Sequence, residues 1–147
     1  MQRKRGWPME KQQIVSLIEM AKHAREFSYS PYSGYMVGAA LLTEEGKVYT
    51  GCNVENAAYG PSNCAERTAI FKAVSEGVQD FTAIAIVGGK RGSAGDYAAP
   101  CGVCRQVMME FCNPETMQVI VAKNAQEYKV FSLAELMPEG FGRTNLE

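Results

Sequence analysis

The feature that most constrains this chain is a set of cysteines carried by two short motifs. Residues 63–67 read Asn-Cys-Ala-Glu-Arg, and residues 100–106 read Pro-Cys-Gly-Val-Cys-Arg-Gln. Cys101 and Cys104 are three positions apart, so on a helix they share one face and can coordinate one metal ion. A catalytic zinc needs three protein ligands and a fourth position open to water. Cys64 supplies the third ligand, so the sequence predicts a fold in which the two motifs meet.

Both motifs are predicted to lie where a helix begins. Pro100 is typical of a helix start, and Cys64 precedes Ala-Glu-Arg-Thr-Ala-Ile-Phe-Lys-Ala-Val, which reads as a helix. Two helix N-termini that point at one site stabilise anionic sulfur. We expect Glu66 to stay unligated, because the site needs a proton carrier and an open coordination position. A Cys-x-Glu motif followed by Pro-Cys-x-x-Cys matches the known signature of zinc nucleobase deaminases.

The chain resembles the small homotetrameric cytidine deaminases from about residue 27 to residue 112, and the similarity is weaker at residues 136–141. Three motifs carry the resemblance: Val-Gly-Ala-Ala-Leu-Leu at 37–42, Gly-Cys-Asn-Val-Glu-Asn-Ala-Ala-Tyr at 51–59, and Cys-Ala-Glu-Arg-Thr-Ala at 64–69. The Asn-x-Glu-Asn-Ala segment is the specific part, since the zinc motifs are shared across the wider deaminase superfamily. The resemblance implies hydrolytic deamination of cytidine and deoxycytidine to uridine and deoxyuridine in pyrimidine salvage.

The resemblance also implies roles for individual residues. Zn²⁺ is held by Cys64, Cys101 and Cys104, and Glu66 moves the protons. The substrate-binding residues that it implies are Asn53, Glu55, Tyr35, Ala65, Ala57, Tyr59 and Phe141. In the family, the residues matching Asn53 and Glu55 hold the ribose hydroxyls, the segment around Ala57 to Tyr59 helps to build a neighbouring subunit's site, and Arg67 donates to zinc-bound sulfur.

Two of these assignments have simpler alternatives in the sequence alone. An Asn-x-Glu pair at a strand end, such as Asn53 and Glu55, is often a turn or cap, and Arg67 could be a surface residue. Tyr35 stands where the family commonly has Phe, and its hydroxyl adds a polar group that needs a partner or water. The assignment of Phe141 to the substrate site depends on the short motif at residues 136–141.

Length and composition limit the class of protein. A chain of 147 residues with formal net charge −1 fits one domain, residues 1–147, and nothing in this charge steers it to nucleic acid. The basic start, about residues 1–8, is expected to be a flexible tail. An odd count of five cysteines with a Cys-x-x-Cys motif and no export signal favours a reducing compartment. No apolar run approaches the ~20 residues of a membrane span. We therefore expect a soluble, cytoplasmic protein with a nucleoside substrate.

The hydrophobic pattern predicts a three-layer α/β/α fold with a five-stranded mixed sheet, which is also the fold that the resemblance implies. His23, the only histidine, falls on the polar side of the first helix, and Arg25 falls at the far end of its apolar stripe. The predicted helices are residues 8–27, 64–76, 101–112 and 132–136, and the predicted strands are residues 36–43, 48–53, 81–87, 117–122 and 128–131. Residues 88–99 are expected to form a flexible surface loop.

Three alternatives remain at this stage. A non-catalytic structural zinc module would need a fourth ligand, for which Cys52 or Cys112 could be recruited. A nucleic-acid deaminase acting on a flipped base would need a basic groove. A deaminase of the same fold could act on another aminopyrimidine such as blasticidin S, although Asn53 and Glu55 favour a free ribose.

Overall fold

The computed structural model describes residues 9–147, so the predicted tail at residues 1–8 lies outside the described residues. The elements in chain order are α1 (Lys11–Arg25), β1 (Tyr35–Thr43), β2 (Val48–Cys52), α2 (Ala65–Ser75), β3 (Phe81–Lys90), α3 (Gly102–Phe111), β4 (Gln118–Ala122), β5 (Tyr128–Ser132), α4 (Leu133–Leu136) and the short 3-10 helix η1 (Arg143–Asn145). Every predicted helix and strand is present, with ends that differ by a few residues.

The strands form one sheet in the order β2-β1-β3-β4-β5. The β1–β2, β1–β3 and β4–β5 pairs are antiparallel, and β3–β4 is parallel. Since β2 and β3 both run antiparallel to β1, they run in the same direction as each other, and α2 connects them across β1. The next connection, through α3, joins the parallel neighbours β3 and β4. The predicted mixed sheet is confirmed, and both α2 and α3 begin at the edge where these parallel strands end.

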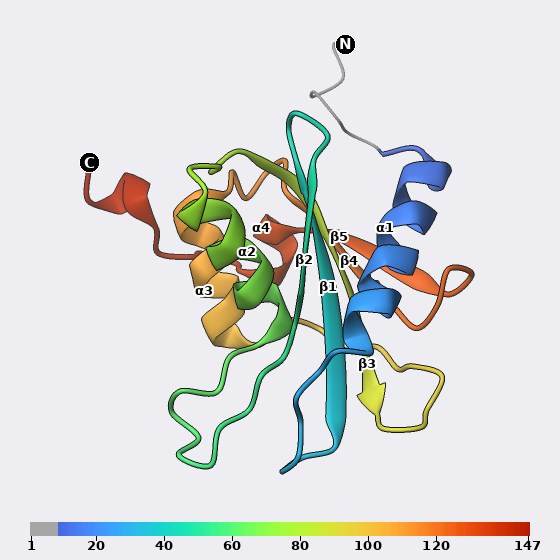
Figure 1. Ribbon diagram of the computed structural model, residues 1–147. Helices are drawn as coiled ribbons and strands as arrows, with labels where there is room; N and C mark the ends of the chain where they lie inside the picture. The colour runs from blue at the N-terminus through green and yellow to red at the C-terminus, as the bar shows by residue number, and fades with distance from the viewer. Residues whose placement is uncertain (1–8) are drawn as a thin grey trace.

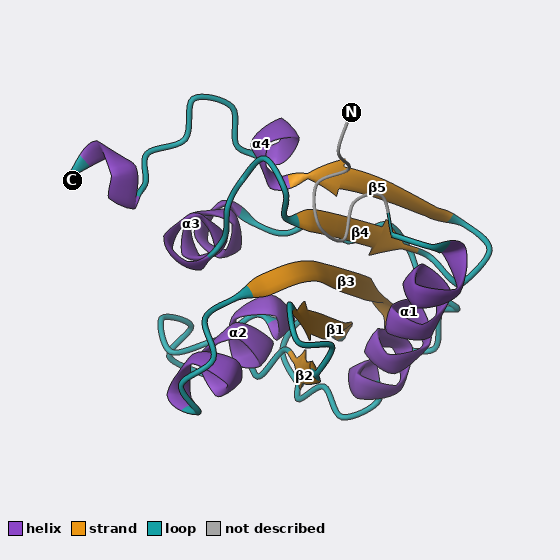
Figure 2. Ribbon diagram, turned by 90° about the horizontal axis from the view of Figure 1, so that it is seen from above, coloured by secondary structure: helices purple, strands orange, loops and turns teal. Residues whose placement is uncertain are grey.

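Helices cover both faces of the sheet (Figures 1 and 2). On one face α1 packs against alternate strand residues such as Ala85 and Ile120. On the other face α2, α3 and α4 pack against the intervening residues, among them Ile84, Ile86 and Val119. The alternation along β3 and β4 explains why these strands read as continuous apolar runs, because both of their faces are buried.

Two glycines let helices approach the sheet closely. A Cβ on Gly38 would lie 2.0 Å from the carbonyl oxygen of Ala21 in α1. A Cβ on Gly51 would lie 2.6 Å from the amide nitrogen of Ala69 in α2. Such distances are far below van der Waals contact, so any larger residue would push its helix outward. At Gly51 this displacement would move the helix that carries Cys64 at its start.

The element ends differ from the prediction at three informative places. Helix α1 ends at Arg25 rather than at residue 27. Strand β3 continues to Lys90 and so takes in the first three residues of the predicted 88–99 loop, because β1 is long enough to pair with it from Tyr35 onward. Cys101 is the N-cap of α3 and precedes its first turn. In the described residues, none of the helices is both long and apolar enough to cross a membrane.

Candidate active site

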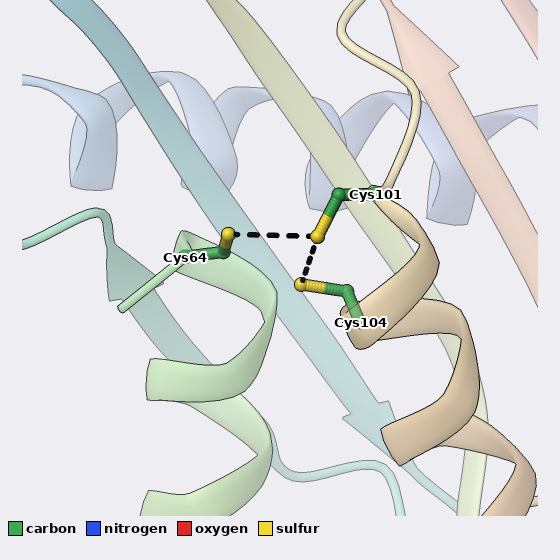
Figure 3. A group of neighbouring side chains, drawn as sticks. All are labelled: Cys64, Cys101 and Cys104. Atoms are coloured by element: carbon green, nitrogen blue, oxygen red, sulfur yellow. Dashed lines mark hydrogen bonds between the residues drawn. The ribbon is translucent and has the colours of Figure 1, made fainter. Parts of the chain in front are cut away.

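Three cysteine sulfur atoms meet between the N-termini of α2 and α3 (Figure 3). The Sγ atoms of Cys64 and Cys101 lie 3.8 Å apart, and those of Cys101 and Cys104 lie 3.6 Å apart. All three Sγ atoms lie within 4.8 Å of one another. Cys64 and Cys101 are the N-cap residues of their helices, yet neither side chain makes a capping hydrogen bond. The thiols are therefore available to another partner.

The spacing of the sulfur atoms fits a zinc ion. Tetrahedral coordination with Zn–S bonds of 2.3 Å places neighbouring sulfurs roughly 3.8 Å apart. Cys52 and Cys112 do not belong to the cluster, which is the one group of three or more metal-binding side chains in residues 9–147. Neither of them can serve as the fourth ligand that a closed structural site needs. Three protein ligands and an open position are the arrangement of a catalytic zinc.

Within the cysteine cluster, anionic sulfur is favoured at Cys64. A hydrogen bond shared with Cys104, together with the guanidinium of Arg67, lowers the pKa of Cys64 to about 5. The same shared hydrogen bond and burial raise the pKa of Cys104. In this pair one sulfur holds a proton that the other has given up, and a bound cation would replace that proton. By contrast, burial alone raises the pKa of Cys112 to about 12, so this thiol behaves as a core residue.

Arg67 lies beside the sulfur cluster and is not a surface residue with its charge in water. Its Nη2 donates to the Sγ of Cys64 at 3.2 Å. Its Nε is buried and has no hydrogen-bond partner within residues 9–147. Three thiolates and one Zn²⁺ carry a net charge of −1, so a cation at this distance offsets charge that the ion leaves over. This geometry favours the role at zinc-bound sulfur over the surface alternative.

Glu66, the predicted proton carrier, is buried next to the cysteine cluster. Its side chain is buried, with 4% exposed, and it lines the same pocket as Cys64 and Cys101. Its carboxylate is not part of the cysteine cluster. Burial, with the nearby Cys64 sulfur as a smaller cause, raises its pKa to about 7. A carboxyl group of this kind can both accept and return a proton near neutral pH.

The cluster opens into a pocket of about 450 Å³, a volume in the range of small-molecule sites. Its lining residues are Ser33, Tyr35, Val37, Asn53, Glu55, Cys64, Ala65, Glu66, Tyr97, Ala98, Ala99 and Cys101. The pocket brings together the predicted residues Tyr35, Asn53, Glu55, Ala65 and Glu66. Ser33, Val37 and the pocket wall at residues 97–99 were not predicted from the sequence. The position of that wall directly before Pro100 was the available signal.

Asn53 and Glu55 line the pocket just after the end of β2, where Asn53 is held by the start of β1 and Glu55 by the loop that precedes β1. The amide of Asn53 bonds the backbone of Tyr35 and Val37 at 2.8 and 2.9 Å. The carboxylate of Glu55 accepts from the hydroxyl of Ser33 at 2.5 Å and from the amide groups of Tyr32 and Ser33 at 3.0 and 3.1 Å. These bonds lower the pKa of Glu55, chiefly through the Ser33 hydroxyl. It is therefore ionised at neutral pH.

Arg25 connects segments that lie next to the pocket. Its position on the apolar stripe of α1 did not predict these contacts. The side chain is buried, with 8% exposed, and all of its hydrogen-bond partners are neutral. It donates to the carbonyl oxygens of Met36 and Gly89, each at 2.9 Å, and to that of Lys90 at 3.1 Å. The guanidinium thus fastens α1 to the start of β1 and the end of β3, next to the loop that carries the pocket wall.

Three predicted residues lie outside this pocket. Ala57, Tyr59 and Phe141 are not among its lining residues, and Tyr59 and Phe141 are 75% and 58% exposed. Tyr59 lies in the loop between β2 and α2, where its ring meets that of Tyr32 edge-on. The carbonyl oxygen of Phe141 accepts a hydrogen bond from Gln106 on α3 at 2.8 Å. A single chain does not bring these residues to the cysteine cluster.

Comparison with known proteins identifies the family to which this chain belongs. Residues 11–123 match the family model described as the cytidine and deoxycytidylate deaminase zinc-binding region. The chain belongs to the cytidine deaminase family. It is 47% identical over 133 residues to the cytidine deaminase of Sporosarcina psychrophila, covering 90% of this chain and 94% of that protein. It is 37% identical over 138 residues to a probable cytidine deaminase of Dictyostelium discoideum, covering 94% and 90%.

Solved structures of family members share the fold. The crystal structure of cytidine deaminase from Burkholderia pseudomallei superposes with a TM-score of 0.76 at 52% identity and covers 86% of this chain and 97% of that chain. That of Mycobacterium tuberculosis gives 0.74 at 37% identity, covering 86% and 95%. The resemblance drawn from residues 37–69 is therefore confirmed, and so is the fold. A zinc-binding family region and the three cysteine sulfurs together make Zn²⁺ the metal that this site fits.

Proposed function

We propose that this protein hydrolyses cytidine and deoxycytidine to uridine and deoxyuridine and releases ammonia. The observation that carries the proposal is that one pocket is lined both by Cys64, Cys101 and Glu66 and by the polar pair Asn53 and Glu55. The cysteines with a bound metal and Glu66 can carry out the hydrolysis, and Asn53 and Glu55 can hold a sugar. The family membership and the names of the relatives agree with it.

In the proposed mechanism Cys64, Cys101 and Cys104 hold zinc, which supplies the Lewis acidity that activates water toward C4 of the base. Glu66 takes a proton from the attacking water and delivers it to N3. It later helps to protonate the amino group, so that the C4–N bond breaks and ammonia leaves. The burial of Glu66 keeps bulk water from competing for these protons. Arg67 stabilises the anionic sulfurs throughout.

The substrate pocket fixes the nucleoside by its sugar. Asn53 donates to, and Glu55 accepts from, hydroxyl groups of the ribose, while Ala65 at the start of α2 lies in the pocket lining beside Glu66. Tyr35 contributes an aromatic ring to the lining, and burial raises the pKa of its hydroxyl, which stays protonated. These roles favour a substrate with a free ribose over blasticidin S among the aminopyrimidines.

The test follows the loss of the cytosine absorbance with cytidine, deoxycytidine, cytosine, CMP and blasticidin S in parallel, together with zinc analysis of the protein. We expect turnover of the two nucleosides with one zinc per chain. A protein that binds zinc and acts on none of these compounds would refute the proposal, and preference for blasticidin S would favour the alternative substrate class.

We further propose that the enzyme works as a homotetramer. The exposed rings of Tyr59 and Phe141 and the exposed Ala57 support this, because they lie outside their own chain's pocket and match family residues that reach a substrate site. In a tetramer these residues would complete the pocket of a neighbouring copy. Light scattering after size exclusion measures the oligomeric state directly. A monomer with full activity would contradict this part of the proposal.

The remaining expectations concern the context of the enzyme. We propose that residues 1–147 are a single deaminase domain and that the enzyme serves pyrimidine salvage in the cytoplasm. The five free cysteines of the chain support a reducing compartment, because thiols needed for zinc must stay reduced.

A further inference from the structure

The amide group of Asn53 can face the pocket in only one way. Its Oδ1 lies 2.9 Å from the backbone nitrogen of Val37, which can only donate, and its Nδ2 lies 2.8 Å from the backbone oxygen of Tyr35, which can only accept. Rotating the amide by half a turn would set donor against donor and acceptor against acceptor. The usual ambiguity between the two ends of an asparagine side chain is therefore removed by the backbone of β1.

Ser28 adds a third partner to this amide. Its Oγ lies 2.5 Å from Oδ1 of Asn53, across 25 positions in the sequence. Because Oδ1 can only accept, the single proton of the Ser28 hydroxyl must point at it. The Oγ of Ser30, a buried residue, lies 3.2 Å from that of Ser28 and can donate to it in turn. The two hydroxyls form a short chain that ends on Asn53, and each bond in such a chain polarises the next.

The hydrogen-bonding capacity left at Asn53 follows by counting. An amide oxygen accepts two hydrogen bonds, and both are taken, by the Val37 amide and the Ser28 hydroxyl. Of the two protons on Nδ2, one goes to Tyr35 and one remains. Toward the pocket Asn53 is therefore a donor only, whereas the carboxylate of Glu55 is an acceptor only. A hydroxyl group is the simplest partner that satisfies both, since it accepts and donates at once.

We propose that Ser28 is a positioning residue that makes Asn53 a pure donor and so tunes the pocket to a sugar hydroxyl. This inference rests on the proposed function and names a determinant of its sugar recognition. Without the Ser28 hydroxyl, Oδ1 would regain a free lone pair, and water or the substrate hydroxyl could donate to it in a competing orientation. The Val37 and Tyr35 bonds would still hold the amide in place, so the fold does not depend on Ser28.

The experiment compares Ser28→Ala with the parent on two substrates, cytidine and 2′,3′-dideoxycytidine, which lacks the 2′- and 3′-hydroxyls and keeps only the 5′-hydroxyl. We expect KM for cytidine to rise about threefold to tenfold, the value of one neutral hydrogen bond, with kcat within about twofold. The rise should be absent with 2′,3′-dideoxycytidine, because that substrate lacks the 2′- and 3′-hydroxyls that we expect Asn53 to meet. Ser28→Thr keeps the hydroxyl and should restore the parent KM. Ser75→Ala, a serine at the end of α2 whose hydroxyl bonds the Lys72 carbonyl, is the matched control.

The outcomes separate the two proposals. An equal penalty on both substrates would show that Ser28 acts on the fold rather than on sugar recognition, and an unchanged KM for cytidine would show that it does not act through Asn53; either result overturns the inference while the deaminase remains. A parent without activity on cytidine would instead refute the proposed function. If Ser28→Ala does not fold, Ser28→Gly removes the same hydroxyl and decides the question by the same ratio of KM values.

Discussion

The two sides of the pocket are organised in opposite ways. The cysteine side (Cys64, Glu66, Arg67, Cys101 and Cys104) has a buried Arg67 Nε without a partner and two thiols whose pKa values are displaced by each other. The side that we propose to hold the sugar (the sugar side: Ser28, Ser33, Asn53 and Glu55) is extensively hydrogen-bonded, with three hydrogen bonds on Asn53 and three on Glu55.

This difference shows what each side requires. The cysteine side gathers three thiols, with anionic sulfur favoured at Cys64, so a bound cation would stabilise it. On the sugar side, most hydrogen-bonding groups are already bonded to the protein. Asn53 keeps one free donor and Glu55 one free acceptor, so this side is ordered before a substrate binds. Changes on the first side should therefore abolish metal or chemistry, and changes on the second should alter recognition by smaller factors.

The largest effect is expected from Cys101→Ala. Losing one of three ligands should remove zinc and turnover together, because two thiolates cannot hold the ion in a catalytic geometry. Metal analysis and the cytidine assay measure both. Cys52→Ala, whose sulfur lies outside the cluster, should keep one zinc per chain. Retained zinc and activity in Cys101→Ala would remove this residue from the site.

Glu66→Gln should separate chemistry from metal binding on the same side. Glutamine keeps the shape of the side chain but cannot accept and return a proton, so zinc content and melting temperature should stay near those of the parent. Because one residue serves several proton transfers, kcat should fall by about 10⁴-fold or more. Glu19→Gln on the exposed face of α1 is the control. Deamination within tenfold of the parent rate would show that another group moves the protons.

Glu55→Gln tests the sugar side. It replaces the carboxylate that we propose as the acceptor of a substrate hydroxyl by a neutral amide, which also leaves Ser33 with a neutral partner. We expect kcat/KM for cytidine to fall about tenfold to a hundredfold, as for a hydrogen bond to a charged group, with zinc content unchanged. An unaltered kcat/KM would show that Glu55 does not contact the substrate. A loss of zinc would show that the sugar side and the cysteine side depend on each other.

Ser33→Ala should give the smallest effect, visible mainly in the pH profile. The Ser33 hydroxyl is the largest cause of the lowered pKa of Glu55, so its removal raises that pKa. The carboxylate is the form that accepts the substrate hydroxyl, and it is lost as pH falls through its pKa. The acid limb of kcat/KM should therefore move to higher pH, measured on cytidine between about pH 4 and 7. A limb that stays in place would mean that Glu55 does not set it.

The sequence determined the parts of this protein that depend on short-range spacing. The interval of three between Cys101 and Cys104 and the hydrophobic periods of the helices and strands follow from local geometry, and both are found in the structure. The zinc ligand set could be named because cysteine, glutamate and their spacing limit the chemistry to very few possibilities.

Only the tertiary structure decided how the pocket is held. The bond from Ser28 to Asn53 spans 25 positions and the bond from Arg25 to Gly89 spans 64. Both are contacts of polar side chains with partners that no periodicity marks, since a serine in a turn or an arginine at a helix end is usually solvated. The hydrophobic pattern placed Arg25 correctly on the buried face, but its neutral partners exist only once α1 has packed across β1 and β3.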